Sequence, residues 1–568
     1  GLREVARLQV GALAVLAESG VPTRWLDPLA DEEQADENTS AEETNKDAGA
    51  GPGGEDADAG DAAAEKAHLA LMVLLDASVV QKSADGSVTM LHRLQGQVLR
   101  ENWNQGERAE AFDAATDLLD RVNIDSLPRS NAEGRRQETL DLIDQLRAIA
   151  AQDYSRPLFE CERVVAGLPH VLFHARDLGL PNEALALRGA VSAVEEVLGE
   201  DHPDTLASRN GLAGAYEGAG RLGEAIALLE EVLADCVRVL GEDHPDALTS
   251  RNNLAYAYES AGRLGEAITL FEEVLADRVR VLGEDHPDAL TSRNNLACAY
   301  ESAGCLGEAI PLYEEVLADR VRVLGKDHPD ALTSRNNLAG AYESAGRLGE
   351  AIPLYEQVLA DRVRVLGKDH PDTLTSRNNL AYAYRVAGRV GEAITLFEEV
   401  LADSVRVLGK DHPQTLTSRN NLAGAYESAG RLGEAIPLYE QTLADRVRVL
   451  GEDHPDTLTS RNGLAGAYES AGRLGEAITL FEEVLADRVR VLGADHPDTL
   501  ISRNNLAVAY ESAGRLGEAI PLFEEVLADR VRVLGPDHPH TLISRNNLAY
   551  AYESAGRLGE AIPVFEQT

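Results

Sequence analysis

The last two-thirds of the chain alternates between two helical patterns of hydrophobic and polar positions. In residues 241–282, Leu248 and Ala255 share one face of a first predicted helix. Phe271 and Val274 start a second apolar stripe of the same kind. Short amphipathic helices bury their apolar faces only against each other and against neighbouring segments. The pattern therefore predicts packed helix pairs.

Proline and glycine residues mark the ends of both helices. Pro245 suits the first turn of a helix, where its missing N–H removes no hydrogen bond, and Gly262 is typical of a left-handed cap. The second helix is predicted to end at Gly283, with Arg278 and Arg280 near its negative end. Several copies carry proline at the fifth position of the second helix. We interpret this position as part of the first turn, because proline is tolerated there. Each unit is thus predicted to be an antiparallel helix pair.

The unit recurs nine times with a period of 42 residues. An Asp-His-Pro motif marks each copy, and its histidines are His202, His244, His286, His328, His370, His412, His454, His496 and His538. A fixed period of this size is typical of a solenoid, in which each unit packs against its neighbours. We interpret the histidines as helix-start and linker residues, because no second ligand type recurs beside them at metal-ligand spacing. The sequence predicts no metal site.

The repeat resembles the tetratricopeptide repeat. Its signature spacing is occupied by Leu254, Ala255, Tyr258, Ala267 and Phe271. The 42-residue length and the Asn-Asn-Leu-Ala and Gly-x-Asp-His-Pro motifs are similar to the kinesin light chain type. The resemblance implies an all-α fold, a right-handed α-solenoid of helix pairs whose last copy is incomplete. It also implies that the first helix of each pair lines a concave groove that binds peptides.

One position of the first helix is asparagine in all nine copies. These residues are Asn210, Asn252, Asn294, Asn336, Asn378, Asn420, Asn462, Asn504 and Asn546. By the resemblance this position faces the groove, where a row of amides can bind the backbone of an extended peptide. The alternative is that each asparagine bonds the neighbouring helix and sets the pitch of the superhelix. The sequence leaves both interpretations open.

Two nearby positions differ between copies. Four residues after the asparagine, six copies carry Gly, Cys or Val, and three carry Tyr256, Tyr382 and Tyr550. Three residues further on, eight copies carry glutamate and one carries Arg385. Variation within otherwise near-identical units indicates a surface adapted to a partner, with Arg385 as a specificity point. The alternative is drift at tolerant positions.

The first 201 residues are organised differently. In chain order we predict the helical start of a winged-helix-like region (1–30), a disordered acidic insertion (31–66), the winged-helix-like remainder (67–104), a helical connector (105–157), a degenerate capping repeat (158–201) and the nine repeats (202–568). The acidic insertion holds thirteen Asp and Glu against two Lys and no aromatic residue. Such a segment buries too little apolar surface to offset its ordering entropy.

Residues 89–94, with the sequence TMLHRL, carry a second resemblance. They are similar to the winged-helix segment that follows the nucleotide-binding core of bacterial STAND (NB-ARC type) ATPases. In that family a Met-His-Asp motif supplies a histidine that contacts the phosphates of the nucleotide, and His92 matches it. Arg93 stands where Asp is usual, and Leu91 intervenes. The resemblance implies ATP or ADP bound in the intact protein; the alternative is a histidine packed in a small helical domain.

Composition narrows the classes of function. The net charge of −43 argues against a nucleic-acid partner and favours a basic or amphipathic protein or peptide. No apolar run reaches the roughly 18 residues that span a bilayer, so we expect no membrane partner. The four cysteines form no CxxC pair, which indicates a reducing, cytoplasmic location. No GxxxxGK[ST] motif and no catalytic arrangement is found, so we expect neither an enzyme nor a cofactor in this chain.

The sequence therefore predicts a protein-interaction module. We expect it to bind a protein or peptide in the concave groove and to be the sensor arm of a STAND-type signalling ATPase. The alternative is a standalone scaffold or cargo adaptor with no ATPase link. Because the chain begins at Gly1 and stops at Thr568 within the second helix of the last copy, we expect further sequence on both sides, with the ATPase domain upstream.

Overall fold

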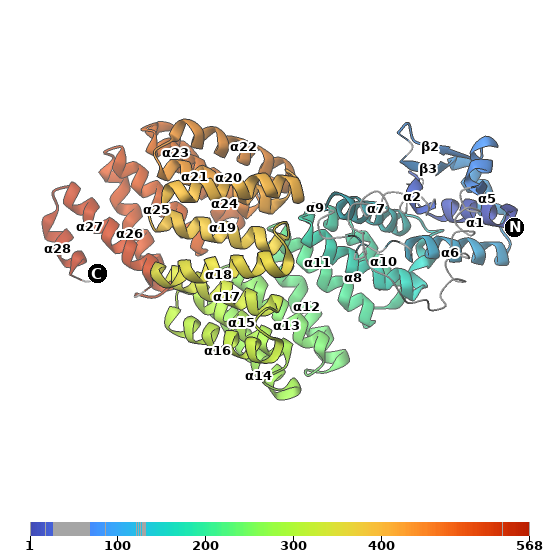
Figure 1. The fold of residues 1–568 in the computed structure, drawn as a ribbon, viewed down its shortest axis with the longest axis horizontal. Coiled ribbons are helices and arrows are strands. Elements are labelled where there is room, and N and C mark those ends of the chain that lie inside the picture. Colours follow the sequence, from blue (N-terminus) through green and yellow to red (C-terminus); the bar gives the residue numbers. More distant parts are fainter. Residues whose placement is uncertain are drawn as a thin grey trace, which may run out of the picture. The chain divides into compact units, whose positions relative to one another are not determined.

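The computed structural model describes residues 2–16, 19–26, 69–85, 87–120, 122, 124, 127, 132–536 and 538–566. The acidic insertion predicted at 31–66 lies outside the described residues. The chain divides into two compact units, Gly1–Pro128 with Gly134–Leu212 and Arg129–Glu133 with Ala213–Thr568. Figure 1 shows the helices of both units in chain order, from blue to red.

The first unit begins with a small sheet among helices. Its first elements are α1 (Leu2–Val15), β1 (Val21–Pro22), α2 (Thr23–Leu26), a helix at 69–76, β2 (Val80–Lys82), β3 (Val88–Leu91), α5 (Arg93–Asn102) and α6 (Gln105–Asp120). The strands are antiparallel in the order β1-β3-β2, and Val21 pairs with Thr89. The sheet thus joins segments that lie on either side of residues 31–66 in the sequence.

The rest of the first unit is helical. It contains α7 (Ala132–Ala151), the 3₁₀ helix η3 (Arg156–Glu160), α8 (Glu162–Asp177), α9 (Pro181–Leu185) and α10 (Arg188–Leu198). Residues 158–201, where we predict a degenerate repeat, thus contain one long helix, α8, followed by two shorter helices, α9 and α10. Leu168 and Val194 are fully buried, so this segment has an apolar core of its own.

The repeats form a regular series of helix pairs. They are α11 (Pro203–Gly218), α12 (Leu222–Leu240), α13 (Pro245–Ser260), α14 (Leu264–Leu282), α15 (Pro287–Ser302), α16 (Leu306–Leu324), α17 (Pro329–Ser344), α18 (Leu348–Leu366), α19 (Pro371–Val386), α20 (Val390–Val407), α21 (Pro413–Ser428), α22 (Leu432–Leu450), α23 (Pro455–Ser470), α24 (Leu474–Val491), α25 (Pro497–Ser512), α26 (Leu516–Val533), α27 (Pro539–Ser554) and α28 (Leu558–Phe565). The predicted all-α solenoid of helix pairs is confirmed.

The motif residues fix the helix ends as the sequence predicts. Pro245 is the first residue of α13, and Nδ1 of the N-cap His244 accepts a hydrogen bond from the backbone N–H of Asp246. Accepting this bond satisfies one of the free N–H groups at the start of the helix. Gly262 has φ +71, a left-handed conformation that glycine adopts without strain. The histidines are therefore helix caps.

The proline at the fifth position of the second helix does not lie where we predicted. Helix α16 begins at Leu306, so Pro311 lies in its second turn, beyond the first-turn position. Pro311 has no N–H to donate to Gly307, but both residues are exposed and water can reach that carbonyl. Copies with threonine at this position keep the backbone N–H, and Oγ1 of Thr269 also donates to the carbonyl of Gly265 at 2.9 Å.

From α11 to α23, each core cluster combines one helix pair with the first helix of the next copy, and the last cluster extends over α23 to α28. Ala255 from α13, Ala267 and Phe271 from α14, and Leu296 and Ala299 from α15 form one such cluster. Phe271 is fully buried. Because every copy depends on the next one to cover its apolar face, the repeats are stable only as an array.

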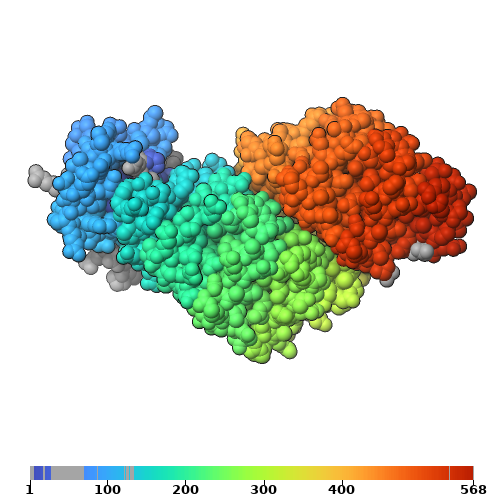
Figure 2. Space-filling view, turned by 180° about the vertical axis from the view of Figure 1, so that it is seen from behind, coloured from blue at the N-terminus to red at the C-terminus, as the bar shows by residue number. Residues whose placement is uncertain are grey.

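Copies far apart in sequence also touch within the second unit. Nε2 of His454 lies 2.9 Å from the carbonyl oxygen of Gly218, and Nε2 of His496 lies 3.1 Å from that of Ser260. Figure 2 shows the orange and red repeats directly against the green ones. The array therefore coils until its later first helices meet the inter-helix turns of the early copies.

Candidate functional site

The first helices of the repeats present a polar face. On α19, Asn378, Tyr382 and Arg385 follow one another at steps of four and three residues, which places them on one side of the helix. The equivalent residues of α21 are Asn420, Gly424 and Glu427. We call this surface of the first helices the polar face; it contains all the groove residues predicted from the sequence.

The asparagine row is linked from copy to copy. In each of six junctions the second asparagine of one copy donates through Nδ2 to Oδ1 of the first asparagine of the preceding copy, at 3.0 to 3.4 Å: Asn295 to Asn252, Asn337 to Asn294, Asn379 to Asn336, Asn421 to Asn378, Asn505 to Asn462 and Asn547 to Asn504. Asn252, Asn294, Asn295 and Asn504 are buried, whereas the other linked asparagines are partly exposed. The contact between copies that we weighed as an alternative is therefore present. The amide protons of the first asparagine still leave donors for a ligand.

The glutamate row is also linked from copy to copy. Serines donate to glutamates of the preceding copy at 2.7 to 3.4 Å: Ser260 to Glu217, Ser302 to Glu259, Ser344 to Glu301, Ser470 to Glu427, Ser512 to Glu469 and Ser554 to Glu511. Burial raises the pKa of Glu259, Glu301 and Glu469 above the usual range, against the effect of the serine hydroxyls. The row is thus a chain of half-buried carboxyls.

The row is interrupted at Arg385. Val386 replaces the serine that would bond Glu343, and burial raises the pKa of Glu343 to about 7. Nη1 of Arg385 donates to Oγ of Ser428 at 3.4 Å, and the guanidinium lies 4.6 Å from the ring centre of Tyr382. Ser428 in turn donates to the carbonyl of Gly424 at 2.8 Å, because no carboxylate stands opposite it.

A pocket of about 710 Å³ opens at this interruption. It is lined by residues of α19, α21 and α23 and by one residue of a second helix, namely Tyr382, Arg385, Asn420, Asn421, Gly424, Glu427, Ser428, Tyr439, Thr459, Asn462, Gly463 and Ser470. Gly463 replaces the second asparagine, and a Cβ there would come within 2.8 Å of the Tyr439 ring. The amide link is therefore missing here, and Asn420 accepts from Oγ of Ser460 at 3.1 Å. We call this the Arg385 pocket.

The two other predicted tyrosines have different surroundings. Tyr256 packs edge-on against Phe271 with ring centres 5.1 Å apart, and Tyr550 packs in the same way against Phe565 at 5.2 Å. Each thus contacts the second helix of its own copy. Tyr550 stays 57% exposed and Tyr382 stays 40% exposed, so both rings remain accessible on the polar face.

His92 caps a helix of the first unit. It is exposed, it precedes α5, and its Nδ1 accepts from the backbone N–H of Leu94 at 3.3 Å. This is the same capping role that the repeat histidines have. His92 is exposed, which does not match the packed histidine that we weighed as an alternative. The sequence linked no other residue of this site to a nucleotide.

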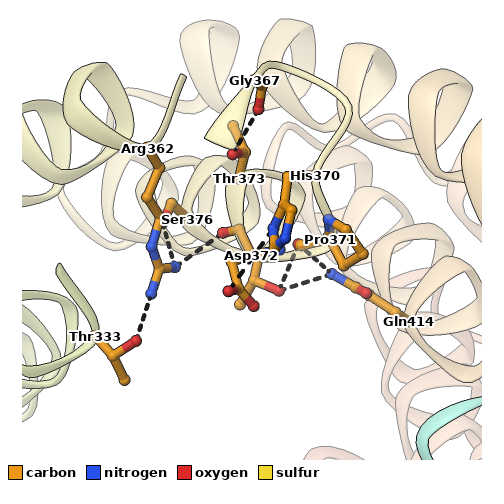
Figure 3. Close-up of polar contacts among 10 residues, drawn as sticks. Thr333, Arg362, Gly367, His370, Pro371, Asp372, Thr373, Ser376 and Gln414 are labelled. Carbon is orange, nitrogen blue, oxygen red and sulfur yellow. Dashed lines mark hydrogen bonds and ion pairs between the residues drawn. The ribbon is translucent and has the colours of Figure 1, made fainter. Parts of the chain in front are cut away.

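The sequence analysis missed a buried arginine in the second helices. Arg362 is 4% exposed, and its Nη1 donates to the carbonyl of Asp372 at 2.8 Å and to Oγ of Ser376 at 2.7 Å. Its Nη2 donates to Oγ1 of Thr333 at 3.0 Å. Figure 3 shows this guanidinium between residues of α17 and α19. The arginine therefore ties its own helix to the first helices of two copies.

Two copies lack this arginine, with Cys236 in α12 and Ser404 in α20, and the second of them has a substitute. Ser404 stands at the arginine position of α20, and Gln414 replaces the aspartate at the start of α21. Nε2 of Gln414 donates to Oγ1 of Thr375 at 2.7 Å and to the carbonyl of Pro371 at 3.3 Å, as Figure 3 shows. Thr375 is the equivalent of Thr333, so the glutamine supplies the bond that the arginine supplies elsewhere. The paired change at 404 and 414 is the sequence signal for this contact.

Metal sites and membrane-spanning helices are not found in the described residues. Among these residues, no group of three or more His, Cys, Asp or Glu is placed to hold a metal ion. In the same part of the chain no helix combines the length and apolar character that crossing a membrane requires.

The comparisons with known proteins concern the repeats. The family profile described as tetratricopeptide repeat matches residues 173–236, 216–278, 252–320, 300–362, 346–403, 372–446, 430–488, 467–530 and 512–568. No curated protein matches the chain.

Many solved structures are similar to it, among them the following three. A putative kinesin light chain from Podosopora anserina, with nearly identical tetratricopeptide-like repeats, is 39% identical over 36% of this chain and 97% of that chain, with a TM-score of 0.31. BtubC (BKLC) from P. vanneervenii is 22% identical over 44% and 93%, with a TM-score of 0.31. A Rap protein complexed with competence and sporulation factor is 13% identical over 65% and 98%, with a TM-score of 0.43.

Proposed function

We propose that the chain, which belongs to the tetratricopeptide repeat family, binds an extended segment of a protein or peptide in a concave groove formed by the polar face. Tetratricopeptide repeats are non-enzymatic protein-interaction modules. The observation that carries the proposal is the Arg385 pocket, where carboxyl, amide, hydroxyl and guanidinium groups converge on one opening. Such a mixture of donors and acceptors suits a peptide backbone with polar side chains.

The asparagine row supports the same proposal. Each first asparagine in these links is held in place through its oxygen by the next copy, as between Asn252 and Asn295. A fixed oxygen orients the amide protons, so the link between copies and the groove role are compatible. We propose that Asn336, Asn378 and Asn462 offer these protons to the peptide, with Tyr256, Tyr382 and Tyr550 as apolar contacts.

A variant that fills the groove tests this proposal without disturbing the fold. Gly466 aligns with Tyr256, and a Cβ at Gly466 would meet only Oε1 of Glu427, at 3.7 Å. Gly466→Tyr therefore places a ring that other copies accommodate beside the Arg385 pocket. We expect it to weaken the capture of peptides from an array at least about tenfold, or ~1.4 kcal/mol, because the ring takes the space that glycine leaves open for the peptide backbone.

The matched control is Pro437→Thr, an exchange that also occurs between copies. Pro437 is exposed on α22, away from the polar face. Capture should be unchanged in this variant. Equal capture by Gly466→Tyr and the natural chain would contradict binding in the groove.

We also propose that the chain is the sensor arm of a STAND-type signalling ATPase in the cytoplasm of a bacterium. The support is the first unit, in which a three-stranded antiparallel sheet precedes α5 and the exposed His92 begins that helix. His92 would then contact the phosphates of ATP or ADP bound by an upstream domain. A Walker A lysine encoded upstream of Gly1 would support this role. Its absence there would favour a standalone scaffold or cargo adaptor.

A further inference from the structure

Arg385 has no ion pair within the part of the chain that the structure describes. The neighbouring arginines do: Arg377 lies 2.7 Å from Asp403, and Arg389 lies 2.6 Å from Glu392. The contacts of Arg385 are one long hydrogen bond to Ser428, at 3.4 Å, and the face of the Tyr382 ring. A guanidinium held over an aromatic ring keeps several N–H groups directed outward. Arg385 is therefore oriented without being neutralised.

Arg385 also does not serve to neutralise Glu343. A guanidinium paired with a carboxyl lowers the pKa of that carboxyl. The pKa of Glu343 is instead raised to about 7, because burial outweighs the attraction of Arg385. Arg385 thus attracts Glu343 without forming an ion pair with it in the described part of the chain.

Two departures from the repeat line the Arg385 pocket, and a third adjoins one of them in the chain. Arg385 replaces glutamate, Val386 replaces the serine that would bond Glu343, and Gly463 replaces an asparagine of the amide link. Arg385 and Gly463 line the same pocket although they lie in different copies, and Val386 adjoins Arg385 in the chain. Changes at tolerant positions would have no reason to converge in space.

We infer that the Arg385 pocket binds the carboxylate of one Asp or Glu side chain in the peptide that occupies the groove. The inference rests on the proposed function. A planar guanidinium binds a carboxylate through two parallel hydrogen bonds, which Glu at this position in the other copies cannot provide. The partner therefore carries one acidic residue in a stretch that is otherwise uncharged or basic, because Glu301, Glu427 and Glu469 repel further negative charge along the row.

The pocket favours a carboxylate over a phosphate group. A phosphate carries up to two negative charges, and the pocket offers one cation beside the carboxyl of Glu427. One guanidinium balances one carboxylate. A phosphoserine at the same place is therefore expected to bind less tightly than aspartate.

The test uses the full chain and arrays of nonapeptides with random Ala, Ser and Lys flanks and a central Asp, Asn, Lys or phosphoserine. Arg385→Glu is the informative variant, because eight copies already carry glutamate there and the fold accepts it. We expect the natural chain to bind central-Asp peptides about tenfold more tightly than central-Asn peptides, or ~1.4 kcal/mol. Arg385→Glu should lose this preference and favour central Lys. Arg389→Gln, four residues away and exposed, should retain it.

Each other outcome overturns a defined statement. Peptide binding without a preference for Asp, or a preference that survives Arg385→Glu, overturns the inference and leaves the groove proposal standing. If phosphoserine peptides bind more tightly than Asp peptides, the ligand of the pocket is a phosphate and not a carboxylate, which also overturns the inference. Absence of binding by any peptide of the arrays overturns the inference together with the proposed function. Circular dichroism of each variant confirms that it is folded.

Discussion

The regular copies α13 to α18 and the interrupted stretch α19 to α23 have the same helices but different polar links. In the regular copies a buried arginine, an asparagine bond and a serine–glutamate bond tie each copy to the next. In the interrupted stretch Ser404 replaces the arginine, Gly463 replaces an asparagine and Val386 replaces a serine, so one link of each kind is missing. The aromatic residues of the second helices stay packed, since Phe397 and Phe481 remain fully or almost fully buried. The array therefore tolerates the loss of polar links where the apolar core is continuous, and this tolerance leaves room for a binding pocket.

The largest expected effect comes from breaking a regular link. Arg362→Ala removes three hydrogen bonds that tie α18 to the first helices of two copies and empties the space of a side chain that is 4% exposed. We expect the free energy of unfolding to fall by about 2–4 kcal/mol. Urea denaturation followed by circular dichroism measures the loss, and hydrogen exchange should place it in α17 to α19.

The control for this variant is Arg364→Ala, which removes an exposed ion pair with Asp327. Exposed ion pairs contribute little to stability, so its unfolding curve should stay close to that of the natural chain. Equal destabilisation by both substitutions would contradict the distinction between the buried arginine and the surface arginine.

A smaller effect is expected from Glu343→Gln and depends on pH. Burial raises the pKa of Glu343 to about 7 from a usual value of 4.5. Between these values the folded state holds a proton that the unfolded state releases, so the contribution of this group to stability falls as pH rises through 7. Because water still reaches part of this side chain and screens its charge, we expect Glu343→Gln to be only ~1–2 kcal/mol more stable than the natural chain at pH 8. The difference should vanish near pH 5.

Glu301→Gln is the matched variant in a regular copy. Glu301 accepts from Ser344 and Tyr313, both at 2.9 Å, so the amide loses part of these bonds. Its gain at high pH should therefore be smaller than that of Glu343→Gln. Thermal denaturation between pH 5 and pH 8 compares the two, and a larger gain for Glu301→Gln would contradict the role assigned to Val386.

The smallest expected effect is the coupling between residues 404 and 414. Gln414 bonds Thr375 where an arginine does so in other copies. Ser404→Arg combined with Gln414→Asp restores the regular link. Ser404→Arg alone places two donors on Thr375, and Gln414→Asp alone leaves Thr375 without either donor. A double-mutant cycle should give a coupling of about 1 kcal/mol that favours the double variant. Additive effects would mean that the glutamine does not replace the arginine.

The helix pairs follow from the sequence because their causes are local. Pro245, Gly262 and the apolar spacing of Leu248 and Ala255 act within one turn or one helix. The same is true of the histidine caps. The sequence did not predict in which turn of α16 the proline lies, because exposed backbone tolerates proline in either the first or the second turn.

The groove residues follow from the sequence only in part. Comparison of the copies singles out Arg385 and the asparagines, since a departure from a repeated pattern is visible in the chain itself. It does not show that Gly463 lies beside Arg385, nor that Asn252 bonds Asn295, because each contact joins different copies. The buried Arg362 was missed for a related reason: a charged residue near a helix end usually lies in solvent, and only the next copy buries it.

By itself, then, the sequence determined the unit, its period and the positions that vary, because hydrogen bonding and apolar spacing within one helix pair are encoded over a few residues. The tertiary structure decided which residues of different copies meet. It placed Arg385 and Gly463 around one pocket and brought His454 to Gly218. The physical reason is that these contacts depend on how successive copies rotate against each other, and that rotation is the sum of packing at every junction.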